Sequence, residues 1–325
     1  MSMHISIWLT NPVVKSWNCS DDQKKTLENA LPECTVSLHK NSKSFKANLK
    51  NTDIALVWVF NQKWLGMAPR LKWIATPSAG KDWFNIDAPE GMIISYGAFH
   101  GRIIAENVIG AILGFIRGLH FAGQFQEKYL WPREEIEPYC DTLRGSHLVI
   151  LGFGKIGNWI AKLAKPFGAI ITGVKRTLIN LPEFFDESDK IITIDDLDSI
   201  LPETDHLILA LPRDIFTDNI IDKRKLGMLP NHCYVYNIGR GNAINEEDLA
   251  NALKNNIIKG AYLDVFKEEP LDINSPLRDC PNTLITPHSS AISPNFLDLF
   301  INEFVDRYRK WKKGFFGFKE KETLI

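Results

Sequence analysis

Three side chains suited to proton transfer and anion binding follow three predicted strands of this 325-residue chain. They are Arg240, Glu269 and His288, and the strands that precede them are the apolar runs at residues 233–237, 261–265 and 282–286. Parallel strands end at one edge of an open sheet, and ligands bind outside that edge. We therefore expect a guanidinium, a carboxylate and an imidazole to meet at one site.

The three residue types complement one another chemically. An imidazole exchanges its proton near neutral pH, so His288 is the candidate acid and base. A carboxylate such as Glu269 stabilises the imidazolium, and the planar guanidinium of Arg240 can bind a substrate carboxylate and balance charge on a developing alkoxide. Singly, each residue also has an ordinary interpretation: Arg240 can cap a turn, Glu269 can be a solvated loop acid, and a lone histidine is usually structural.

The stretch that would position a cofactor beside these residues runs from 147 to 176. It reads as a strand at residues 148–151, a helix with apolar residues three and four apart, and a second strand at residues 170–174. Between the first strand and the helix stand Gly152, Gly154 and Gly157. This spacing in this context is typical of a dinucleotide-binding turn, where pyrophosphate meets the helix N-terminus.

The end of the second strand indicates which dinucleotide binds. NAD sites usually carry an acid about 20 residues after the glycines, but this chain has Lys175, Arg176 and Thr177 there and no carboxylate before Glu183. Two cations and a hydroxyl favour NADP(H), with NAD(H) as the alternative if these are ordinary solvated charges. Further cofactor contacts are expected at Lys155, Ile156, Leu211, Pro212 and Gly239.

Composition limits the class of protein. The chain is 45% hydrophobic and 24% charged with a net charge of −1, which is ordinary for a globular protein and argues against a nucleic-acid binder. Its five cysteines form no CxxC pair and suggest reduced thiols in the cytoplasm. We find no metal-ligand cluster, no signal peptide and no membrane-spanning stretch, since the most apolar helix, at residues 103–119, is short and carries Glu106 and Arg117.

The first hundred residues also alternate strands and helices but lack a glycine fingerprint. We expect strands at residues 4–9, 35–38, 54–59, 71–75 and 92–95, and a helix that begins in a capping box at Ser20. A loop of small residues, Ser78, Ala79 and Gly80, offers backbone amides that could receive a carboxylate, although it could equally be a simple turn.

These motifs together resemble the D-isomer-specific 2-hydroxyacid dehydrogenase family, particularly its glyoxylate/hydroxypyruvate reductase-like members. The matching segments span residues 54–290: the glycine turn at 152–157, Asn-Ile-Gly-Arg-Gly at 237–241, residues 261–270, and Thr-Pro-His at 286–288. The resemblance implies that Arg240 binds the substrate, that Glu269 pairs with His288 as acid/base, and that Asp264 lies near the cofactor. It also places the amides of residues 78–80 on the substrate carboxylate, and Trp58, Phe60 and Trp83 in or near loops at the substrate mouth.

The family resemblance implies an α/β fold of two Rossmann-like domains with doubly wound parallel sheets. A flavodoxin-like substrate domain would comprise residues 1–100 and 289–325, and a dinucleotide-binding domain residues 101–288, with a homodimer formed through the latter. The expected activity is reduction of a small 2-keto acid to the D-2-hydroxy acid. The alternatives are a formate or phosphoglycerate dehydrogenase of the same family, and a nucleotide-sensing corepressor or scaffold on the same fold.

Overall fold

The chain forms two compact α/β units in the computed structural model, which describes residues 2–81, 84, 86–126 and 131–314. The first unit runs to His100 and resumes at Ile292, and the second runs from Gly101 to Ala291. In this described part of the chain, no helix has both the length and the apolar character needed to cross a membrane.

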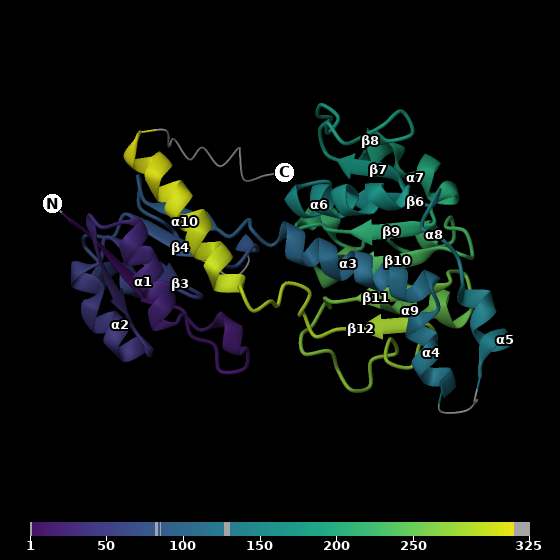
Figure 1. Ribbon diagram of the computed structural model, residues 1–325, viewed down its shortest axis with the longest axis horizontal. Helices are drawn as coiled ribbons and strands as arrows, with labels where there is room; N and C mark the ends of the chain where they lie inside the picture. The colour runs from purple at the N-terminus through teal and green to yellow at the C-terminus, as the bar shows by residue number, and fades with distance from the viewer. Residues whose placement is uncertain (1, 82–83, 85, 127–130, 315–325) are drawn as a thin grey trace. The chain divides into compact units, whose positions relative to one another are not determined.

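The first unit is built on a five-stranded parallel sheet in the order β2-β1-β3-β4-β5. This is the flavodoxin-like order, as predicted. Its strands are β1 (Met3–Trp8), β2 (Cys34–Leu38), β3 (Ile54–Val57), β4 (Trp73–Thr76) and β5 (Ile93–Tyr96). Its helices are α1 (Asp21–Ala30), α2 (Ser42–Asn48) and α10 (Phe296–Lys312). Strands β3 and β4 of this sheet are labelled in Figure 1. The capping box at Ser20 is present, with Gln23 as its partner.

The second unit is built on a seven-stranded parallel sheet in the order β12-β11-β10-β9-β6-β7-β8. The strand order reverses between β6 and β9, which is the topological switch point of a doubly wound dinucleotide-binding fold. The strands are β6 (His147–Leu151), β7 (Ile170–Lys175), β8 (Lys190–Thr193), β9 (His206–Leu209), β10 (Tyr234–Asn237), β11 (Gly260–Leu263) and β12 (Thr283–Ile285).

Helices cover both faces of this second sheet. They are α3 (Gly101–Ile116), α4 (Leu119–Gln126), α5 (Arg133–Ile136), α6 (Lys155–Ala164), α7 (Leu197–Ile200), α8 (Lys223–Leu226) and α9 (Glu246–Lys254). Alternate residues of β6 enter two different cores: Ile150 packs with residues of α3 and α6, whereas Leu151 packs with residues of α7, α8 and α9. A strand buried on both faces needs this continuous apolar sequence, so β6 was predictable.

Short 3-10 helices connect the main elements. They lie at Lys15–Trp17, Leu49–Asn51, Gln62–Met67, Glu137–Tyr139, Lys165–Phe167, Ile194–Asp196, Leu201–Glu203, Ile215–Thr217 and Gly241–Ala243. The one at Lys165–Phe167 follows α6 directly, so the helix ends before Pro166 as its missing amide predicts.

Two predicted boundaries differ from the structure. The helix expected to continue to residue 119 or 120 ends at Ile116, because Gly118 has a left-handed φ of 68° and starts a new helix. A side chain at that glycine would also meet Ile136, at 2.7 Å from its Cγ2. Strand β8 was not predicted, because it has only four residues and begins with an exposed lysine.

Candidate active site at the carboxyl edge of the second sheet

The glycine turn after β6 forms a cradle of backbone. Gly152 has a φ of 88°, and a Cβ there would lie 2.5 Å from the carbonyl oxygen of Ala210. A Cβ at Gly157 would lie 2.7 Å from the carbonyl oxygen of Gly152. No side chain caps the start of α6 at Gly154, so the first amides of the helix are open to an anion. The turn fits a dinucleotide pyrophosphate, with Lys155 and Ile156 at its helical end.

Close contacts between loops bring the other predicted residues to this edge. A Cβ at Gly239, after β10, would lie 2.4 Å from the carbonyl oxygen of Leu211, in the loop after β9. A Cβ at Gly241 would lie 1.8 Å from the carbonyl carbon of Phe266, in the loop after β11. Only glycine allows these approaches. Arg240 stands between the two glycines, so its backbone is held against both neighbouring loops.

Hydrogen bonds also fix the main chain around Arg240. The side-chain amide of Asn237, which is 2% exposed, donates to the Arg240 carbonyl at 3.1 Å. Its side-chain oxygen accepts from the Gly239 amide at 3.2 Å. The Arg240 guanidinium donates through Nη1 to the carbonyl of Gly239 at 2.9 Å. These bonds therefore fix the main chain from which the Arg240 side chain extends.

Glu269 and His288 are in direct contact. Glu269 Oε2 lies 2.8 Å from His288 Nδ1, and Glu269 Oε1 accepts from the Phe266 amide at 2.9 Å. Burial alone would raise the pKa of Glu269, but the His288 and Phe266 hydrogen bonds and the charges of His288 and Arg240 outweigh it and hold that pKa below its usual value. The carboxylate thus stays ionised, and the imidazole keeps Nε2 for a substrate.

The loop that carries His288 is tied to Asp264, the residue after β11. His288 has a left-handed φ of 50°, and its amide donates to the Asp264 carbonyl at 2.8 Å. The Asp264 carboxylate is fully buried and accepts from the Thr286 hydroxyl at 2.6 Å and from the amides of Ser289 and Ser290 at 2.7 and 3.0 Å. These bonds impose the strained conformation that aims the imidazole.

The end of β7 presents its two cations differently. Lys175 is only 8% exposed, and burial lowers its pKa. Arg176 is largely exposed, and its Nη2 lies 2.6 Å from Oδ2 of Asp214, in the loop after β9. Thr177 is exposed. Both cations adjoin the glycine turn through the β6–β7 pairing, in which Leu151 lies beside Val174.

Residues 109–290 match the D-isomer specific 2-hydroxyacid dehydrogenase, NAD binding domain. This match covers more than half of the chain. The chain belongs to the D-isomer specific 2-hydroxyacid dehydrogenase family. It is therefore an NAD(P)-dependent 2-hydroxyacid dehydrogenase, as the sequence motifs indicated.

Relatives of this dehydrogenase share both sequence and fold. It is 31% identical over 235 residues to glyoxylate/hydroxypyruvate reductase B of Pectobacterium carotovorum subsp. carotovorum (strain PC1), covering 70% of this chain and 72% of that protein. It is 29% identical to the glyoxylate reductase of Thermofilum pendens (strain DSM 2475 / Hrk 5), covering 79% of each. The crystal structure of a D-isomer specific 2-hydroxyacid dehydrogenase family protein from Aeromonas salmonicida subsp. salmonicida A449 matches with a TM-score of 0.80 at 28% identity, over 97% of both chains.

Substrate-binding residues predicted in the first unit of the dehydrogenase lie near the carboxyl ends of β3 and β4. Among the described residues, nothing accepts a hydrogen bond from the amides of Ala79 and Gly80, whereas the Ser78 amide donates to the Thr76 hydroxyl at 3.2 Å. Two amides are therefore open to a carboxylate.

The aromatic residues predicted at the substrate mouth have different outcomes in the structure. Trp58 packs in an aromatic cluster: its indole N–H donates to the Trp17 carbonyl at 3.0 Å and its ring stacks on Phe296 at 5.8 Å. Its predicted substrate contact stays a prediction. Phe60 is only 6% exposed and packs in the core of the first unit with Phe45 and Trp64. Trp83 lies outside the described residues.

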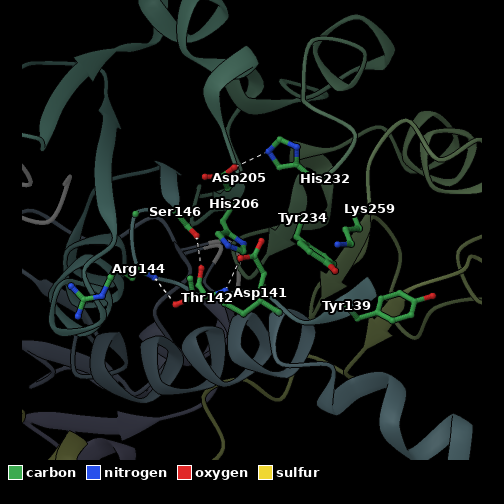
Figure 2. Close-up of a pocket in the computed structure, with 12 residues that line it drawn as sticks. Tyr139, Asp141, Thr142, Arg144, Ser146, Asp205, His206, His232, Tyr234 and Lys259 are labelled. Carbon is green, nitrogen blue, oxygen red and sulfur yellow. Dashed lines mark hydrogen bonds and ion pairs between the residues drawn. The ribbon is translucent and has the colours of Figure 1, made fainter. Parts of the chain in front are cut away.

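A pocket at the opposite edge of the second sheet of the dehydrogenase is not this site. It lies where β6, β9 and β10 begin and includes Ser146, His206 and Tyr234 in its lining (Figure 2). Figure 2 also shows the ion pair between His232 and Asp205, whose atoms lie 2.8 Å apart. None of the predicted catalytic or glycine-turn residues contributes to the lining, so we assign no step of the reaction to it.

Sequence reasoning missed two contributors to the dehydrogenase site. Thr286 was treated only as part of a motif, yet its hydroxyl donates to the buried Asp264. Asp214 was not singled out, although Asp214 and Thr217 form a capping box two residues after Pro212. That D-x-x-T spacing was the available signal, because it fixes an acid in the loop that faces the cofactor turn.

Proposed function

We propose that this dehydrogenase reduces a small 2-keto acid, of the glyoxylate or hydroxypyruvate kind, to the D-2-hydroxy acid with NADPH as the preferred cofactor. The observation that carries the proposal is the 2.8 Å pair of His288 and Glu269, set on the same sheet edge as Arg240 and the glycine turn. The names of the relatives above support the choice of substrate class.

Each residue has a defined part in the proposed reaction. When bound, the cofactor supplies a hydride to the carbonyl carbon of the keto acid. His288 donates the Nε2 proton to the carbonyl oxygen, and Glu269, hydrogen-bonded to Nδ1, stabilises the imidazolium before transfer. Arg240 binds the substrate carboxylate and balances negative charge as it develops on oxygen. In the first unit, the open amides of Ala79 and Gly80 are candidate donors to a carboxylate, and we propose this unit as the substrate domain.

The preference for NADPH is argued from the end of β7. The Lys175 side chain is only 8% exposed, and no carboxylate among the described residues pairs with its ammonium, which is therefore available to an anion. The 2′-phosphate of NADP(H) would be such an anion, and Arg176, the next residue in the chain, would add a second cation.

The test is oxidation of NADPH and of NADH, followed at 340 nm, over a panel of 2-keto acids. We expect turnover with glyoxylate or hydroxypyruvate and a higher kcat/KM with NADPH. Tight cofactor binding without turnover of any keto acid would overturn the reductase proposal and favour a scaffold. A tenfold higher kcat/KM with NADH would overturn the cofactor preference.

We also propose a homodimer formed through the second unit, with α3 as one contributing helix. The proposal is based on the family resemblance, since the nine buried residues of α3 are already covered within the single chain. Light scattering after gel filtration tests it: the expected mass is twice 37.0 kDa, and a single-chain mass would overturn it.

A further inference from the structure

The acid that the sequence lacks at the end of β7 is supplied by a different loop. Asp214 lies after β9, and the sheet order is β9-β6-β7. To bring its carboxylate 2.6 Å from the Arg176 guanidinium, the loop must cross the end of β6, where the glycine turn begins. The Asp214–Arg176 pair therefore stands at the adenosine end of the predicted cofactor site.

Asp214 is held in this position. Its Oδ1 accepts from the Phe216 amide at 3.1 Å, and its own amide donates to the Thr217 hydroxyl at 3.1 Å. The hydrogen bonds from Arg176 and Phe216 keep the pKa of Asp214 below its usual value. The negative charge is thus permanent at any working pH and cannot swing away without breaking the capping box.

Lys175, the last residue of β7, precedes Arg176 and adds a second cation near this end of the strand, with no carboxylate partner among the described residues. Arg176, which favours a phosphate, and Asp214, which repels one, occupy one subsite. The Phe216 ring, 77% exposed and centred 5.9 Å from the Arg176 guanidinium carbon, offers an apolar face beside them.

We propose that Asp214 is a specificity-determining residue that restrains the preference for a 2′-phosphorylated cofactor. Without a 2′-phosphate, Asp214 neutralises Arg176 and is an acceptor for a ribose hydroxyl. With a 2′-phosphate, Arg176 has to be shared between two anions, and the acid weakens binding. The inference rests on the proposed cofactor preference and goes further by assigning what limits it.

Binding of adenosine 2′,5′-bisphosphate and of 5′-AMP tests the inference without turnover, because the two ligands differ only in the 2′-phosphate. Calorimetry on the full chain gives the ratio of their Kd values. Asp214→Asn keeps the oxygen that caps the Phe216 amide and removes the charge. The substitution should lower the Kd of the bisphosphate about three- to tenfold and change the Kd of 5′-AMP little.

Two further variants serve as comparisons for Asp214→Asn. Arg176→Gln should move the ratio the other way, weakening the bisphosphate about tenfold or more while Asp214 is released. Asp198→Asn is the matched control, since Asp198 forms a surface pair of the same 2.6 Å length with Arg224 in the same unit; it should leave the ratio unchanged. Thermal melting checks that each variant is folded.

The outcomes separate this inference from the proposed function. A ratio in Asp214→Asn that equals the wild-type and Asp198→Asn ratios would overturn the role of Asp214, whatever the keto-acid assay shows. An opposite shift, with 5′-AMP favoured, would overturn it as well. Failure of the chain to reduce any keto acid would overturn the proposed function but not a measured change in the ratio.

Discussion

The main-chain amide of His288 donates to the main-chain carbonyl of Asp264 at 2.8 Å, and the Asp264 carboxylate accepts from the two residues that follow the histidine. Asp264 therefore acts on the candidate acid through its loop. A buried aspartate with every bond directed to one turn is a positioning residue, and its effect on the reaction should pass through the geometry of His288.

Asp264→Asn should lower kcat without weakening cofactor binding. An amide has one oxygen, so its NH2 group must face a donor among Thr286, Ser289 and Ser290, which costs about 1–3 kcal/mol for the unsatisfied buried group. We expect a lower Tm and a kcat reduced about tenfold or more as the imidazole loses its aim. Stopped-flow binding of NADPH, steady-state kinetics and thermal melting measure the three effects. A lower Tm with an unaltered kcat would show that Asp264 only stabilises the fold.

His288→Ala should lower kcat by about 10²–10⁴-fold, the usual contribution of a positioned acid. The KM for the keto acid should change little, because Arg240 still binds the carboxylate. Fluorescence titration should show that the cofactor binds as before, since the imidazole contacts none of the glycine-turn residues. Unchanged kinetics would remove His288 from the mechanism and with it the dehydrogenase assignment of this site.

Glu269→Gln should alter the pH profile of reduction. The low pKa of Glu269 means that the wild-type carboxylate is charged across the working range and favours protonated His288. Reduction needs that proton, so the limb on which kcat falls with rising pH should move to lower pH in the variant. At neutral pH, kcat should drop about tenfold for the loss of one charged hydrogen bond.

Glu268→Gln is the matched control for that change, since this neighbouring glutamate is exposed and Glu269, not Glu268, is the partner of His288. Its profile should overlay the wild type. Identical shifts in both variants would mean that general surface charge, and not the 2.8 Å contact, sets the profile.

Arg240→Lys should reduce kcat/KM for the keto acid by about 10²-fold, since a lysine keeps the charge but loses the planar fork. Both KM and kcat should worsen, because the guanidinium binds the substrate before and during the reaction. Steady-state kinetics over a range of keto-acid concentrations separates the two constants. A rise in KM alone, with kcat intact, would limit Arg240 to substrate binding.

The sequence predicted the features that depend on local pattern. The strand–glycine–helix unit around Gly152 follows from apolar periodicity and steric demand, and the break at Pro166 follows from a missing amide. Strand ends also predicted the common edge of Arg240, Glu269 and His288, because parallel topology fixes that edge. Asp214 could not be placed on Arg176 in the same way, since that contact depends on how far one loop crosses a neighbouring strand.

The features that the sequence did not predict are a short strand and a helix end. Strand β8 gains its stability from pairing with β7, in which Ile191 lies beside Gly173, and its own four residues carry little signal. The premature end of α3 depends on Gly118, whose left-handed turn is stabilised by packing near Ile136, a residue 18 positions away in sequence. Both features result from tertiary contacts that override local propensity.

Acid should destabilise the second unit through His206. This residue is 2% exposed with its ring 3.0 Å from the Tyr236 hydroxyl, and burial lowers its pKa from 6.5 to about 4. Between pH 6.5 and about 4, His206 therefore binds a proton in the unfolded chain but not in the folded chain. The stability from the neutral ring is complete above pH 6.5 and is lost as the pH falls towards 4, by about 3 kcal/mol in all.

His206→Gln removes this titration. Between pH 7.5 and pH 4.5, the urea midpoint of unfolding should fall less steeply for the variant than for the wild type. At pH 7.5 the midpoint of the variant should already be lower, because the packed imidazole ring is missing. Contributions from the other histidines are common to both proteins and cancel. Parallel slopes for His206→Gln and the wild type would show that the buried imidazole does not drive unfolding in acid.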